Sequence, residues 1–173
     1  AAMRPYKKGV YHQGTWRKQI DFGTGTLGDM GVHIFDTPYR ALALTHPNWV
    51  RTSCRKPTGV GHPEKNVVEY VFPGTPYTTD TMRWTWYDGA DAPPAMDGLG
   101  VPEGLKLPNQ GALFVGEDGT MLLPHSSEPQ LLPEDNSNLR LGRIWNRATI
   151  TISGSTRVWE PARPVLPSVM PVL

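Results

Sequence analysis

Residues 66–87, NVVEYVFPGTPYTTDTMRWTWY, contain the two strongest strand patterns in the chain and decide its fold class. Asn66–Phe72 and Met82–Tyr87 are rich in β-branched and aromatic residues, which favour strands. The connection FPGTPYTTDT is too long for a tight turn. We therefore predict two sheet strands that are joined by a longer loop.

Further strands are predicted on both sides of this pair. Trp49–Cys54 has the pattern of a short strand. Gly111–Val115 and Thr120–Leu123 flank the sequence Gly-Glu-Asp-Gly, and Asp-Gly tolerates the positive φ angles that tight hairpins need. The Gly/Pro-rich segment Asp88–Gln110 separates this hairpin from the first pair, and a loop of that length is usually functional or mobile.

A helical pattern precedes the strands. Apolar residues recur at spacings of three and four within Leu27–Leu44. Pro38 lies inside this pattern and is expected to kink or split a helix, because proline lacks a backbone N–H. We predict a helix over about 26–37 and a second short turn through Ala43. Residues 1–20 show neither period and are predicted to form a basic, aromatic extended arm.

The composition limits the class of protein. Lys and Arg total 17 and Asp and Glu total 16, so a net charge of +1 gives no indication of a nucleic-acid or membrane-surface partner. Cys54 is the single cysteine, which excludes an intrachain disulfide framework and a cysteine zinc cluster. No apolar run has the length of a membrane span, and no signal-peptide stretch opens the chain, so its cellular location stays undetermined. The 18 glycines and 18 prolines, with 38% hydrophobic residues, indicate one turn-rich domain that is mostly β or α+β.

Asp29 and His33 form the sharpest local feature. In a helix they are four residues apart and therefore share one face. A carboxylate beside an imidazole favours the protonated ring and can fix its tautomer, which suits a general acid or base near neutral pH. The glycine between them, Gly31, leaves room for a ligand. The alternative, favoured by spacing alone, is a buried hydrogen-bonded pair that anchors the helix.

Aromatic and charged residues elsewhere suggest a sugar site, because aromatic rings stack on sugar faces and charged groups bind hydroxyls. Trp84 and Trp86 alternate along one predicted strand, however, and that pattern favours core packing over a binding surface. The residues that we name as candidate substrate contacts are Trp16, Arg17, Asp36, Trp86 and Asp88.

Other catalytic and metal-binding patterns are weak or absent. The chain has no Ser-His-Asp signature, no phosphate-binding Gly-x-x-x-x-Gly-Lys loop and no dinucleotide-binding G-x-G-x-x-G motif. One histidine with two aspartates on a single helix is an incomplete metal site. The remaining histidines are expected in unrelated loops: His12, His46, His62 and His125.

The run Trp16-Arg17, followed by DFGTGTLGDMGVHIFD at residues 21–36, resembles the C-terminal domain of bacterial-type Gfo/Idh/MocA oxidoreductases. The resemblance spans about residues 4–141. Later stretches that agree are EYVFP at 69–73, WYDG at 86–89, Pro93-Pro94 and GALFVGEDG at 111–119.

The resemblance implies an α+β domain with an open, mostly antiparallel sheet and helices on one face, spanning residues 21–141. Such a domain forms the substrate wall and a subunit interface, which implies a homo-oligomer through the sheet. The family pattern D-x-G-x-H maps onto Asp29 and His33. The resemblance therefore makes His33 the acid/base of a reaction on a sugar, cyclitol or related polyol, with Asp29 orienting it or binding substrate.

The family binds NAD or NADP in a separate N-terminal Rossmann domain, which these 173 residues do not include. We therefore expect no cofactor site in this chain, and no dehydrogenase activity from the chain alone. Glu64-Lys65 looks superficially like part of the family's E-K-P motif, but it lies in the wrong domain.

Residues 142–173 have a different character. They hold four arginines against the single acid Glu160, a net charge of +3, and four prolines follow that acid. The resemblance stops here, where the family continues with R-N-H-Y-H-Q. Codon triplets shifted by one base across Asn146–Ser153 can spell P-R-N-H-Y-H-Q, so we hypothesise a frameshift near Leu141. The alternative is a genuinely divergent tail. We expect poor order in this tail, although ATITIS at residues 148–153 has strand alternation.

Two other functions stay open. Some relatives use NAD transiently to cleave glycosides, and the same D-x-G-x-H face would serve them. A standalone saccharide-binding or interaction module is the non-enzymatic alternative, with the loop at residues 88–110 as its binding element.

Overall fold

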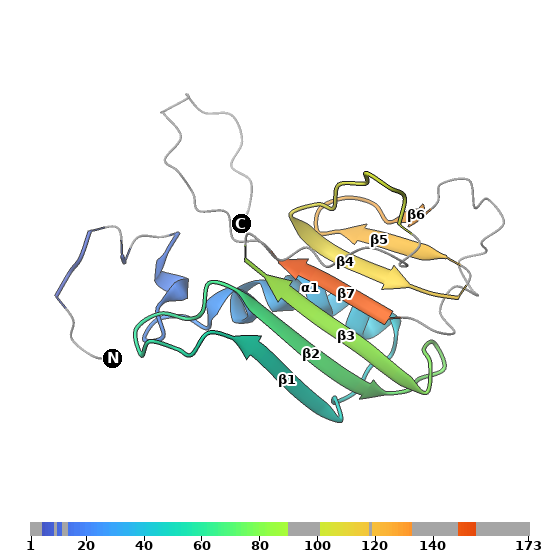
Figure 1. The fold of residues 1–173 in the computed structure, drawn as a ribbon, viewed down its shortest axis with the longest axis horizontal. Helices are drawn as coiled ribbons and strands as arrows, with labels where there is room; N and C mark the ends of the chain where they lie inside the picture. The colour runs from blue at the N-terminus through green and yellow to red at the C-terminus, as the bar shows by residue number, and fades with distance from the viewer. Residues whose placement is uncertain are drawn as a thin grey trace.

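The computed structural model describes residues 5–8, 10–11, 14–89, 101–117 and 119–132, together with the backbone of residues 149–154. The fold is α+β, as predicted. Two antiparallel units of three strands each, β1–β2–β3 and β4–β5–β6, join through β7 into one seven-stranded sheet of order β1-β2-β3-β7-β4-β5-β6 (Figure 1). The bounds are β1 Trp49–Cys54, β2 Asn66–Pro73, β3 Thr81–Asp88, β4 Gln110–Val115, β5 Thr120–Pro124, β6 Gln130–Leu132 and β7 Thr149–Gly154.

The strand predictions are confirmed to within one residue at each end. In the antiparallel register Val68 lies opposite Trp86 and Tyr70 opposite Trp84, so the large side chains of β2 and β3 gather on one face. Val115 pairs with Thr120 across the predicted hairpin, which the bond from Gly116 N to Gly119 O closes at 2.8 Å.

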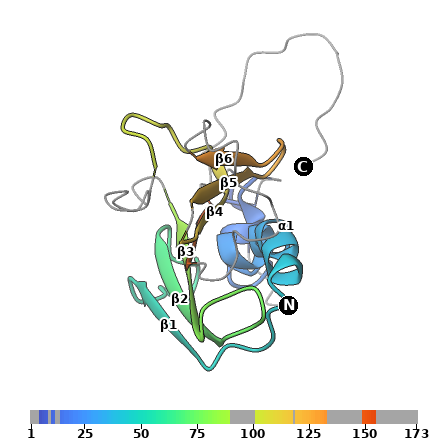
Figure 2. The ribbon, with the colours of Figure 1, turned by 90° about the vertical axis from the view of Figure 1, so that its right-hand side faces the viewer.

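One α-helix lies within the described residues, α1 at Gly25–Ala41, and it covers one face of the sheet (Figure 2). The predicted split at Pro38 is wrong, because the helix continues through this residue. Proline removes one amide donor from the last turns, and the carbonyl of Pro38 still accepts a 3.0 Å bond from Leu42 N. Pro38 is buried, so packing on the sheet offsets the lost bond.

The core fills the layer between α1 and the sheet. Trp84 is 1% exposed and Trp86 is 0% exposed, which confirms the interpretation of this alternating pair as core. Phe35 of α1 packs edge-to-face on Trp84, with ring centroids 4.4 Å apart. A second cluster of Leu113, Leu122 and Leu132 lies apart from the first, and Leu105 and other residues of the preceding loop pack against it.

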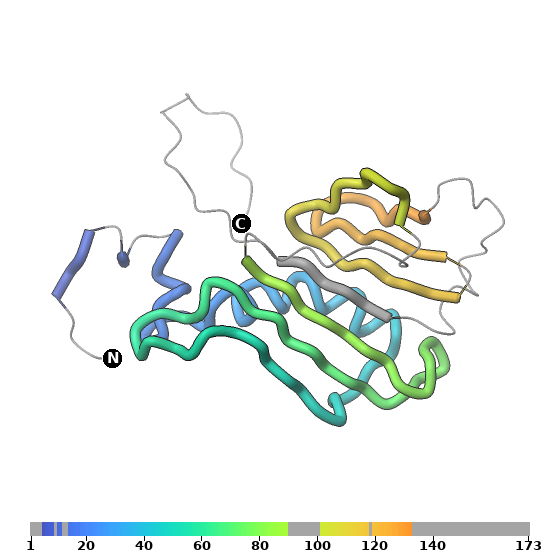
Figure 3. Tube along the Cα trace, viewed as in Figure 1, coloured from blue at the N-terminus to red at the C-terminus, as the bar shows by residue number. Residues whose placement is uncertain are grey.

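The described part of the predicted arm is anchored to the domain. Trp16–Lys18 form a 3-10 turn, η1, and Gln19 makes a bridge with Gly61. Ile20 N donates to Val60 O at 2.9 Å, and the arm lies beside the β1–β2 connection (Figure 3). The arm therefore contacts both the connection between β1 and β2 and the helix α1.

The predicted tail, residues 142–173, falls mostly outside the described residues. The described backbone of this segment is β7, as its alternation suggested, parallel to β3 and antiparallel to β4. Within the loop predicted at residues 88–110, the structure describes residues 88–89 and 101–110.

Candidate functional site

Asp29 lies on the first half of α1, where the anchored arm meets the helix. Arg17 Nε lies 3.1 Å from Asp29 Oδ2, and both side chains are about two-thirds or more buried. The contact is an ion pair without hydrogen-bond geometry, since Arg17 Nε has no hydrogen-bond acceptor. The Arg17 guanidinium also lies 5.7 Å from the ring centroid of Trp16. These three predicted site residues therefore come together.

The prediction that the Asp29 carboxylate contacts the His33 imidazole is wrong. The four-residue spacing on one helix is confirmed, but the Asp29 carboxylate faces Arg17 instead. His33 is exposed, and among the described residues no hydrogen bond or ion pair holds its ring, so the alternative of a buried anchoring pair is wrong as well. An exposed imidazole without an internal partner is free to exchange a proton with a ligand.

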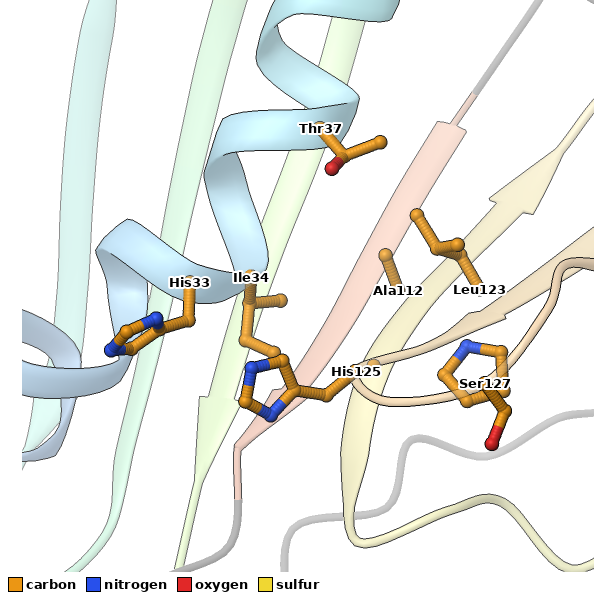
Figure 4. Close-up of a pocket in the computed structure, with 9 residues that line it drawn as sticks. His33, Ile34, Thr37, Ala112, Leu123, His125 and Ser127 are labelled. Carbon is orange, nitrogen blue, oxygen red and sulfur yellow. The ribbon is translucent and has the colours of Figure 1, made fainter. Parts of the chain in front are cut away.

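His33 lines a shallow pocket of about 110 Å³ between α1 and the β4–β5 hairpin. Ile34, Ala112, Leu123 and Pro124 contribute hydrocarbon to the lining, and His33, Thr37, His125 and Ser127 contribute polar groups, which make up most of its exposed surface. Figure 4 shows His33 and Thr37 projecting from the helix, with His125 on the segment after β5. A mostly polar lining with some hydrocarbon suits a small polyhydroxy compound, whose hydroxyls meet the polar groups.

His125 is the residue that sequence reasoning missed. Its ring centroid lies 5.6 Å from that of His33, with the planes tilted by 47°. His125 Nδ1 lies 2.9 Å from Gln110 Oε1, and its backbone N donates to Gln110 O at 3.0 Å. The expectation that His125 sits in an unrelated loop is wrong, because the β4–β5 pairing brings it to the helix. Its position two residues after the predicted strand Thr120–Leu123 was the only signal.

Trp86 and Asp88, both predicted to contact a substrate, lie in the interior. Asp88 is 1% exposed, and its carboxylate accepts from Trp86 Nε1 at 2.8 Å and from Asn66 N at 2.9 Å. Asn66 Nδ2 donates to both carboxylate oxygens. Burial raises the pKa of Asp88, and these hydrogen bonds oppose the rise. Neither side chain is accessible to a ligand here, so their substrate role is corrected to a structural one: they fasten the end of β3 to β2.

Asp36 is exposed on α1 and is not among the residues that line the pocket. Its nearest described charge is Arg40, whose Nη1 lies 3.9 Å from Asp36 Oδ2. Such an exposed pair at i and i+4 contributes little. The prediction that Asp36 contacts substrate gains no support from this placement.

The start of α1 does not fit a dinucleotide. Gly23 and Gly25 precede and open the helix, but the arm backbone and His62 cover them: a Cβ on Gly23 would lie 2.4 Å from Arg17 O, and one on Gly25 would lie 3.1 Å from the His62 ring. Phosphate binding needs open amides at a helix N-terminus. The start of α1 is therefore not a phosphate-binding loop for a nicotinamide cofactor.

The described residues show neither a metal-binding cluster nor a membrane-spanning helix. No group of three or more His, Cys, Asp or Glu side chains is placed to hold a metal ion in this part of the chain. Within the same ranges, no helix combines the length and apolar character that crossing a membrane requires.

In comparisons with known proteins, no protein-family model and no curated protein matched this chain.

Proposed function

We propose that this chain is the substrate-binding domain of an NAD(P)-dependent oxidoreductase that acts on a sugar, a cyclitol or a related polyol. The observation that carries the proposal is His33: an exposed imidazole without an internal hydrogen bond among the described residues, in the mostly polar lining of a pocket. The D-x-G-x-H run supports the same assignment, and so does the α+β architecture.

The chemistry assigned to this chain is proton exchange. His33 accepts the proton of a substrate hydroxyl during oxidation and returns it during reduction. The hydride chemistry would be supplied by a nicotinamide bound to another domain. Asp29 does not act as a base, because Arg17 lies against its carboxylate. The Arg17–Asp29 pair instead ties the arm to the helix that positions His33. Oligomerisation through the sheet stays a prediction.

The first test is the DNA upstream of codon 1. The proposal expects an in-frame G-x-G-x-x-G and E-K-P within about 600 bases, a reach that fits one further domain of about 200 residues. The protein encoded by that whole frame is then assayed for NADH formation with a panel of polyols. His33→Ala should lower kcat by about 10²–10⁴, the usual contribution of a general acid or base. His46→Ala, at an exposed histidine that does not line the pocket, is the control.

The outcomes separate the candidate functions. NADH that accumulates and depends on His33 supports the dehydrogenase. Glycoside cleavage without net NADH would indicate the NAD-dependent hydrolase. A frame without a nucleotide-binding domain, together with saccharide binding by the chain alone, would indicate a standalone binding module. NADH formation by the isolated 173 residues would contradict the expectation that this chain has no cofactor site.

A further inference from the structure

His125 and His33 line the same pocket, and contacts with Gln110 hold His125 in place. Its backbone N donates to Gln110 O, and its ring contacts the side chain of the same residue. Gln110 opens β4 and His125 directly follows β5, so the antiparallel ladder sets their separation. The sheet therefore holds His125 in place, whereas His33 is positioned by the helix.

The contact with Gln110 favours one protonation pattern of the His125 ring. His125 Nδ1 lies 2.9 Å from Gln110 Oε1, and an amide oxygen can only accept a hydrogen bond, so this contact favours the tautomer in which Nδ1 carries the proton and donates. In the neutral ring the other nitrogen, Nε2, is then an acceptor. Among the described residues nothing else binds this ring by a hydrogen bond or an ion pair, and the ring lines the pocket.

We infer that His125 is a second ligand-binding residue of this site, whose Nε2 accepts a hydrogen bond from a hydroxyl of a ligand that also contacts His33. The inference rests on the proposed function, in that the ligand is a polyhydroxy compound. The two rings line one pocket with centroids 5.6 Å apart, so one small polyol in the pocket can contact both imidazoles. Gln110 acts through His125 and is a positioning residue.

The first experiment needs no ligand. Long-range ¹H–¹⁵N correlation spectra of the histidine rings, recorded on the 173-residue chain near pH 8.5, distinguish a protonated ring nitrogen from a bare one. Free histidine favours the Nε2–H tautomer. We expect His125 as the Nδ1–H tautomer, and Gln110→Leu should return it toward the tautomer of the free amino acid. A wild-type His125 with its proton on Nε2 would overturn the inference.

The second experiment titrates the same chain with myo-inositol and with methyl α-D-glucopyranoside. Binding should shift the His33 and His125 ring signals together. His125→Asn keeps a donor near Gln110 but removes Nε2, and it should weaken binding about three- to tenfold, the loss of one neutral hydrogen bond. His46→Asn, at an exposed histidine that does not line the pocket, should leave binding unchanged.

The possible results distinguish this inference from the proposed function. If His33→Ala weakens binding and His125→Asn does not, the inference is overturned and the proposed function stands. If neither compound binds or perturbs either ring, both fail. Equal losses in His125→Asn and His46→Asn would assign the effect to the fold and would also overturn the inference.

Discussion

The Asp88 carboxylate offers the sharpest test of how the sheet is held together. Asp88→Ala would remove the acceptor of Trp86 Nε1, Asn66 N and Asn66 Nδ2 in one step. The indole N–H of Trp86 belongs to a side chain that is 0% exposed, so water cannot replace the lost acceptor. Asn66 is only partly buried, and water can replace part of what its donors lose.

The magnitude follows from these burials. A buried donor left without a partner costs about 1–3 kcal/mol, and a hydrogen bond to a charged group contributes about 1.5–3 kcal/mol net. Removing the buried carboxylate also relieves its desolvation, which is the main reason why its pKa is raised. We expect a net loss of about 2–4 kcal/mol, a large part of the 5–15 kcal/mol that stabilises a typical domain.

The assay is urea unfolding followed by tryptophan fluorescence, which reports on the buried indoles of Trp84 and Trp86. Asp36→Ala is the matched control, because it removes an aspartate whose side chain is 61% exposed and whose partner, Arg40, lies 3.9 Å away. That change should cost no more than about 0.5 kcal/mol. The midpoint should fall in Asp88→Ala with little change in the slope.

A loss below about 1 kcal/mol in Asp88→Ala, or an equal loss in Asp36→Ala, would refute this reasoning. Either result would mean that the network around Asp88 adds nothing beyond its desolvation cost. Trp86→Phe separates the contributions, since it removes the indole donor and leaves both Asn66 donors in place.

Four further predictions concern charge and backbone. Because the folded pKa of Asp88 is raised, folding favours the protonated carboxyl. The stability that this preference contributes is complete below the ordinary aspartate pKa and is lost as pH rises through the folded value. The cost of Asp88→Ala, measured by urea unfolding, should therefore be smaller at pH 7 than at pH 4. Glu64 is bound by Arg55 in two hydrogen bonds, which lower its pKa to about 2, so carboxyl NMR should show its titration midpoint near that value and a shift toward the ordinary range in Arg55→Gln; a normal midpoint in the wild type would contradict the contact. Gly31→Ala places a Cβ in ordinary contact inside α1 and should raise the unfolding free energy by about 0.5–1 kcal/mol in the same urea assay; destabilisation would contradict the available space. Gly23→Ala would put a Cβ 2.4 Å from the arm backbone, so the arm should detach and be cut faster by protease than in Gly31→Ala.

Local pattern was sufficient for α1 and most strands, whereas β6 and the turn η1 were not predicted. The strands β1 to β5 follow from alternation and from β-branched and aromatic composition, and α1 follows from apolar spacings of three and four. Pro38 shows the limit of this reasoning, because its penalty was predicted from local chemistry and its compensation comes from burial against the sheet. The α+β class was therefore predictable, and the uninterrupted helix was not.

The partners of the site residues were less predictable than the elements. Asp29 and His33 share a helix face, yet the Asp29 carboxylate pairs with Arg17 from the arm, because an arginine brought close competes for it. Asp88 was expected to contact substrate, and Trp86 was named as a candidate contact although its alternation with Trp84 favoured the core; the β2–β3 register buries both of them. In each case the decisive neighbour lies on a different element.

The sequence by itself determined most of the segments that form helix and strand, and it placed Asp29 and His33 one helical turn apart. It also showed that phosphate-binding and disulfide patterns are absent. Each of these features depends on residues within a few positions of one another. Only the tertiary structure decided that His125 lies beside His33 and that Gln110 contacts the His125 ring. Those contacts join residues 92 and 15 positions apart, and strand order and register, not local periodicity, bring such residues together.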